Sequence, residues 1–123
     1  DGAVEVEEEG GMLLIGARRL IREIVEDIGK GDPAAVVSAR FHNWIKASLV
    51  KAAEMLRQTH RISRVALSGG CFQNETLLKD LRSQLRERDF DVIINEKVPA
   101  NDGGISFGQV VVAAARLEAQ GED

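Results

Sequence analysis

Apolar residues recur at steps of three and four in several stretches of the chain, and this spacing predicts amphipathic helices. The first predicted helix covers residues 17–28 and ends at a glycine-rich turn, residues 29–31. A longer helix follows, with Asp32 as the N-cap and Pro33 at the first helical position, and it runs to about residue 58.

Two further helices are predicted over residues 75–88 and 105–117, the last of them rich in Val and Ala and therefore suited to close packing. Residues 65–67 form a short, continuous apolar run typical of a buried parallel strand, and residues 91–94 are predicted as the next strand. The order strand, helix, strand, helix predicts an α/β fold with a short parallel sheet covered by helices.

The N-terminal region offers two further candidate strands. Residues 12–15 form a short apolar run that is either a strand or the start of the next helix, and Val4 and Val6 alternate with acids as an edge strand would. We nevertheless expect residues 1–10 to be an acidic, disordered lead and residues 11–120 to form one domain. Because most α/β domains carry more strands than this, the domain resembles part of a larger one.

Composition narrows the class of protein. Of the 20 acidic residues five lie in the first nine positions, so the remaining chain has 15 acids against 16 bases and is nearly neutral. Such a chain lacks the basic stripe of a nucleic-acid binder, and an aromatic content of 4% without Tyr argues against base stacking. The single cysteine excludes an internal disulfide and favours a cytoplasmic location, and no apolar run is long enough for a membrane span.

Two glycine turns are the best candidates for a binding site. Ser68, Gly69 and Gly70 follow a predicted strand and precede a helix, which is where unpaired backbone N–H groups meet an anion. We expect phosphate contact through both glycine N–H groups, assisted by the Ser68 hydroxyl and the Asn74 amide. The same glycines also suit a tight turn that binds nothing, and the run lacks the Lys of a P-loop.

The second turn, Asn101-Asp102-Gly103-Gly104, precedes the last helix. Asp102 is placed either to cap that helix or to bind a divalent metal beside a phosphate. No acid or histidine cluster with ligand spacing accompanies it, so further metal ligands would lie outside this chain.

Covalent catalysis by this chain is not expected. Ser68 and Cys71 would each need a positioned base, and the chain offers only His42, which faces either solvent or the glycine turn, and His60, which is expected to be solvated. Cys71 is expected to be a small buried hydrophobe, and we assign no catalytic residue.

Three segments resemble one family. The runs 68–74 (SGGCFQN) and 98–109 (VPANDGGISFGQ), with residues 39–42 (ARFH) ahead of them, are similar to the C-terminal end of HypF, the carbamoyltransferase of [NiFe]-hydrogenase maturation. The resemblance covers roughly residues 17–118. It implies the second lobe of an actin-like ATPase domain, built on a ribonuclease-H-like fold and similar to TsaD.

The resemblance also implies an activity. HypF proteins make carbamoyl adenylate from carbamoyl phosphate and ATP and pass the carbamoyl group to the C-terminal Cys of HypE, for the cyanide ligand of the hydrogenase iron. By this resemblance Gly69, Gly70 and Asn74 match the nucleotide-contacting turn, Gly103 and Gly104 shape the second turn, and Asp102 matches a metal ligand. With Ser68, whose hydroxyl faces the same turn by the reasoning above, these five residues form the expected nucleotide site. The paired metal-binding histidines of the first lobe and the acylphosphatase-like, zinc-finger and YrdC-like domains have no counterpart here, so the chain alone is expected to be inactive.

Other functions remain open. A lobe of a small-molecule O-carbamoyltransferase shares much of this C-terminal pattern, and the two glycine motifs favour HypF over a TsaD-like tRNA-modifying protein. A non-catalytic module that binds a protein partner is an alternative of a different class.

Overall fold

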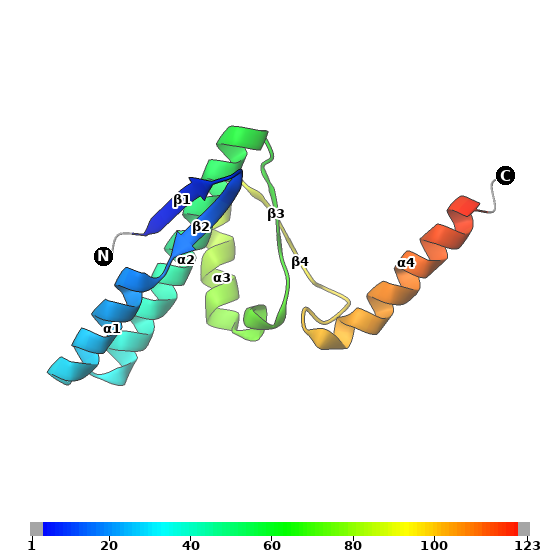
Figure 1. Cartoon of the computed structure of the whole chain (residues 1–123). Helices are drawn as coiled ribbons and strands as arrows, with labels where there is room; N and C mark the ends of the chain where they lie inside the picture. The colour runs from blue at the N-terminus through cyan, green and yellow to red at the C-terminus, as the bar shows by residue number, and fades with distance from the viewer. Residues whose placement is uncertain (1–3, 121–123) are drawn as a thin grey trace.

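The computed structural model describes residues 4–120, which form two separate two-stranded sheets and four α-helices (Figure 1). In chain order the elements are β1 (Glu5–Glu9), β2 (Met12–Gly16), α1 (Arg18–Lys30), α2 (Ala34–His60), β3 (Arg64–Leu67), the 3₁₀ turn η1 (Gly70–Gln73), α3 (Glu75–Arg86), β4 (Asp91–Ile94), the 3₁₀ turn η2 (Asp102–Gly104) and α4 (Ile105–Gln120).

The acidic lead is ordered over most of its length, so the prediction of disorder was wrong for residues 5–9. They pair antiparallel with β2, from Glu5 opposite Gly16 to Glu9 opposite Met12. Gly10 and Gly11 make the connection with φ of 58° and 80°, the left-handed backbone that a two-residue hairpin needs. The strand interpretation was right for Val6, which lies in β1, whereas Val4 precedes the strand. Residues 1–3 lie outside the described residues.

An ion pair joins α1 and α2. Asp27 of α1 is buried, and its carboxylate accepts a hydrogen bond from the guanidinium of Arg40 on α2. The prediction of Asp32 as the N-cap of α2 was wrong, because the helix begins at Ala34 after Pro33 and no side chain caps it. The helix ends later than predicted, at His60, where Arg61 takes a left-handed conformation and donates its N–H to Arg57 O.

The core lies between α2, α3 and the parallel sheet. β3 and β4 pair in parallel from Arg64 opposite Asp91 to Leu67 opposite Ile94, as predicted. The buried cluster comprises Val50, Leu67, Leu81, Leu85, Phe90 and Val92. Alternate residues Ala66 and Ile93 are exposed, so helices cover only one face of this sheet and the expectation of fully buried strands was wrong.

The last helix, α4, extends away from the other elements (Figure 1). It continues to Gln120, beyond the predicted end, and touches the rest of the described chain mainly through η2. Its apolar side chains are exposed, namely Ile105, Phe107, Val110, Val111, Val112 and Leu117. The close packing predicted for this helix therefore does not occur within residues 4–120. None of the described helices is both long enough and apolar enough to cross a membrane.

Leu81 provides a test of the core, because its side chain has no exposed surface. We predict that Leu81→Ala lowers the free energy of unfolding by about 2–5 kcal/mol, the usual cost of a cavity in a packed core. Leu117→Ala is the control, since Leu117 is 70% exposed, and it should cost less than about 0.5 kcal/mol. Urea denaturation followed by circular dichroism measures both, and equal costs would contradict this assignment of the core.

Candidate functional site

The two glycine turns meet at one edge of the molecule. β3 and β4 are parallel, so the turns that follow them leave the sheet at the same side. A hydrogen bond of 2.9 Å joins the turns, with the Gly69 N–H donating to the carbonyl oxygen of Ala100. Gly69 has φ of 106° and ψ of 163°, a conformation open essentially to glycine alone. The turn therefore requires Gly69, and the N–H of Gly69 serves the fold rather than a ligand.

The first turn is closed by backbone hydrogen bonds between residues three positions apart. The Phe72 N–H donates to Gly69 O at 3.0 Å, and the Asn74 N–H donates to Cys71 O at 3.2 Å. Ser68 and Gly70 are exposed, and within residues 4–120 the Gly70 N–H has no hydrogen-bond acceptor. Cys71 is exposed as well, so the expectation of a buried cysteine was wrong: the 3₁₀ turn directs Phe72 inward instead.

In the second turn the capping residue is Asn101. Its side-chain oxygen accepts the Gly103 N–H at 3.0 Å, and its backbone oxygen accepts the Gly104 N–H at 3.0 Å. Asp102 follows as the first residue of η2, so its carboxylate is exposed and is not used as a cap. A Cβ added to Gly104 would lie 2.6 Å from the carbonyl oxygen of Pro99, closer than real Cβ atoms approach.

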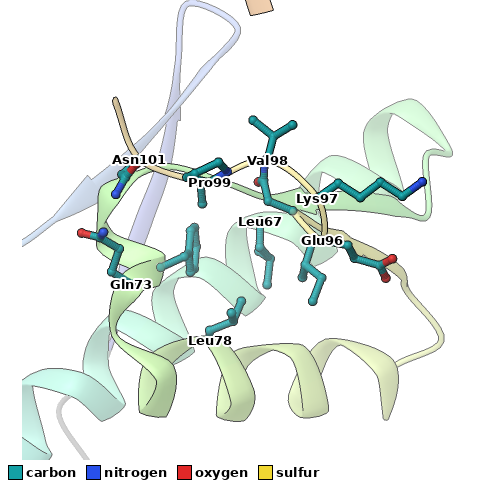
Figure 2. Close-up of a pocket in the computed structure, with 12 residues that line it drawn as sticks. Leu67, Gln73, Leu78, Glu96, Lys97, Val98, Pro99 and Asn101 are labelled. Carbon is teal, nitrogen blue, oxygen red and sulfur yellow. The ribbon is translucent and has the colours of Figure 1, made fainter. Parts of the chain in front are cut away.

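A hollow of about 420 Å³ lies between the turns, beneath the loop that connects β4 to η2. Figure 2 shows Gln73 and Asn101 together at one end of it and Glu96 and Lys97 at the other. Leu67 and Leu78 lie in the middle part. The hollow therefore has an apolar centre and polar ends, and none of the predicted nucleotide-site or metal residues lines it.

His42 is a residue of this site to which the sequence reasoning gave no role. The ring lies against the first turn, where its Nε2 is 2.9 Å from the amide nitrogen of Asn74. His60, by contrast, is exposed at the end of α2, as expected. The position of His42 in the run 39–42 was the available signal, but periodicity alone left its direction open between solvent and the turn.

Two charged pairs lie near the start of α3. Glu75 and Lys79 form an exposed ion pair of 2.7 Å, and the hydrogen bond together with the charge of Lys79 lowers the pKa of Glu75. The same contact raises the pKa of Lys79. The Lys46 ammonium reaches Asp80 at 2.6 Å and so ties α2 to α3.

Metal ligands are scarce. No group of three His, Cys, Asp or Glu side chains that would hold a metal occurs within residues 4–120. Asp102 is a single exposed carboxylate, so by itself it offers at most one ligand. Asp102 could therefore supply one ligand of a metal site, and the other ligands are not found within residues 4–120.

We predict that Gly104→Ala destabilises the chain by about 1–3 kcal/mol, because the new methyl group would clash with backbone that the turn cannot move cheaply. Gly108→Ala is the matched control in α4, where an added Cβ meets nothing within 4 Å. That change should cause no loss, since Ala is the better helix former. Denaturant midpoints compare the two variants, and equal midpoints would count against the crowded turn.

Comparison with protein families gives a match over residues 1–109, to the model described as Carbamoyltransferase, Kae1-like Domain, second subdomain. The carbamoyltransferase HypF of Synechocystis is 35% identical over 109 residues, which is 88% of this chain and 13% of that protein. The HypF of Rhodobacter capsulatus is 34% identical over 91 residues, covering 74% of this chain and 12% of that one. The chain thus spans a small part of the curated relatives that it matches, between 12% and 28% of their length.

A solved structure, full-length HypF in the phosphate- and nucleotide-bound form, superposes with a TM-score of 0.86. It is 40% identical and covers 94% of this chain, which corresponds to 15% of that protein. This match confirms the predicted α/β fold with a short parallel sheet, and the family match extends the resemblance into the acidic lead. The chain belongs to the HypF carbamoyltransferase family, in which it corresponds to the second subdomain of the Kae1-like domain.

Proposed function

We propose that this chain supplies one wall of the nucleotide site of a HypF-type carbamoyltransferase. The complete protein would make carbamoyl adenylate from carbamoyl phosphate and ATP. It would then transfer the carbamoyl group to the C-terminal Cys of a HypE-like acceptor during hydrogenase maturation in the cytoplasm. The remaining lobe and the N-terminal domains of the parent would supply the other groups.

The observation that carries the proposal is the hydrogen bond between the Gly69 N–H and Ala100 O. It holds the turn that carries Ser68, Gly70 and Asn74 next to the turn that carries Asp102. The hollow of about 420 Å³ is lined by the neighbouring residues Phe72, Gln73 and Asn101 and not by these four. A relative that is 40% identical over this region has been solved in a phosphate- and nucleotide-bound form, which supports a nucleotide site in the complete protein.

The roles of the six proposed nucleotide-site residues differ. Ser68 and Gly70 are exposed, and we assign phosphate contact to the Ser68 hydroxyl and the Gly70 N–H. Gly69, Gly103 and Gly104 donate their N–H groups within the protein, so their part is to shape the turns. Asn74 retains one side-chain N–H after its contact with His42, and this hydrogen is available to a ligand.

Asp102 would hold a divalent cation together with phosphate oxygens and with ligands from the missing lobe. When bound, such a cation neutralises phosphate charge. Because residues 4–120 contain no cluster of metal-binding side chains, we expect Asp102 to bind the cation only when ATP is present.

We predict that ATP with Mg²⁺ shifts the backbone amide signals of Ser68, Gly70 and Asp102 in the NMR spectrum of the labelled chain. Asp102→Asn should remove the part of the shift that depends on Mg²⁺, because the amide carries no charge. Asp89→Asn is the matched control, an exposed Asp outside the turns in a left-handed conformation that Asn tolerates. Absence of any shift at millimolar ATP would contradict nucleotide binding by this chain.

A second prediction concerns catalysis. The purified chain should not transfer a carbamoyl group from carbamoyl phosphate and ATP, because the glycine turns offer one carboxylate, that of Asp102, and residues 4–120 contain no set of metal ligands. Release of pyrophosphate measures adenylate formation directly. Turnover by the chain alone would show that the active groups lie within it and would overturn the assignment of a single wall.

A further inference from the structure

His42 forms the centre of a chain of hydrogen bonds that crosses from α2 to the first glycine turn. Its Nδ1 lies 2.8 Å from the backbone oxygen of Ser38, one turn earlier in α2. Its Nε2 lies 2.9 Å from Asn74 Nδ2. Asn74 Oδ1 in turn accepts the backbone N–H of Leu77 at 3.1 Å and caps α3. The network therefore runs from a carbonyl of one helix to the N-terminus of another.

The partners leave the imidazole only one neutral tautomer. A backbone oxygen can only accept, so the His42 Nδ1 must carry the hydrogen that is given to Ser38 O. Nε2 is then a bare acceptor, which matches the Asn74 Nδ2 hydrogen that faces it. The Ser38 hydroxyl lies farther from Nδ1, at 3.4 Å, and does not compete with the carbonyl.

The orientation of the Asn74 amide is fixed from both sides. The Leu77 N–H requires the oxygen of the amide, and His42 Nε2 requires its nitrogen. If the amide were reversed, two donors would face each other at Leu77 and two acceptors would face each other at His42. One hydrogen of Asn74 Nδ2 is used by the ring, so only the second is free.

We propose that His42 is a positioning residue, which holds the Asn74 side chain in the single orientation that both caps α3 and presents one amide hydrogen to the ligand side of the turn. The capping role stands on the structure alone. The ligand-facing role rests on the proposed nucleotide site. His42 is not a catalytic residue in this scheme, because its two ring nitrogens are both occupied by protein groups.

The first test is the tautomer. In a long-range ¹H–¹⁵N correlation spectrum of the labelled chain at neutral pH, His42 should show hydrogen on Nδ1 and none on Nε2. A ring with hydrogen on Nε2 would overturn the proposal, since that atom could no longer accept from Asn74.

The second test is hydrogen exchange at the Leu77 amide, which the Asn74 cap protects. His42→Ala should speed this exchange about 5-fold, the factor expected for losing one neutral hydrogen bond. The Leu85 amide in the core reports global unfolding and should change much less. His42→Gln, whose side-chain oxygen is an acceptor, should restore most of the protection, and His60→Ala is the control at the exposed histidine.

These outcomes separate the proposal from the proposed function. Unchanged exchange at Leu77 in His42→Ala, or equal acceleration at Leu77 and Leu85, would overturn the positioning role whether or not the chain binds ATP. If ATP shifts the Gly70 signal, His42→Ala should also weaken ATP binding about 5-fold. If ATP causes no shift while Leu77 responds as expected, the nucleotide site fails and the role of His42 in the cap stands.

Discussion

Both glycine turns lie at one edge of the molecule because β3 and β4 run parallel and in register, from Arg64 opposite Asp91 to Leu67 opposite Ile94. The parallel pairing brings residues some thirty positions apart in the sequence to the same end of the sheet. The bond from the Gly69 N–H to Ala100 O then sets the distance between the turns. The core beneath the sheet, centred on Leu81 and Leu85, holds this pairing in place.

Three of the four glycine N–H groups in the turns are consumed in building them. The N–H groups of Gly69, Gly103 and Gly104 all donate to protein oxygens. A glycine-rich turn is therefore not automatically an anion cradle, since the glycines are also what allow the chain to fold so tightly. What remains for a ligand includes the N–H groups of Gly70 and Cys71, two polar side chains and one carboxylate, which is a small share of what phosphate chemistry requires.

Particular residues show how far the sequence could be read. The four helices were predicted because their apolar residues recur at helical spacing, and the two parallel strands because each contains a short apolar run. The N-terminal segment and the start of α2 were less well predicted. Residues 5–9 form a strand because backbone pairing with β2 outweighs the repulsion between their acidic side chains, and Asp32 does not cap α2. Cys71 is exposed because the 3₁₀ turn buries its neighbour Phe72, a choice that hydrophobicity alone does not make.

By itself the sequence determined the four helices, the two parallel strands, the two glycine turns and the family, since these depend on local periodicity and on short motifs. Only the tertiary structure decided which groups of the site remain available and which are already bonded. Asn101 rather than Asp102 caps the second turn, and His42 faces Asn74 rather than solvent. The physical reason is that hydrogen-bond partners between segments far apart in the chain are chosen by the packing of α2, α3 and the sheet, which no local pattern specifies.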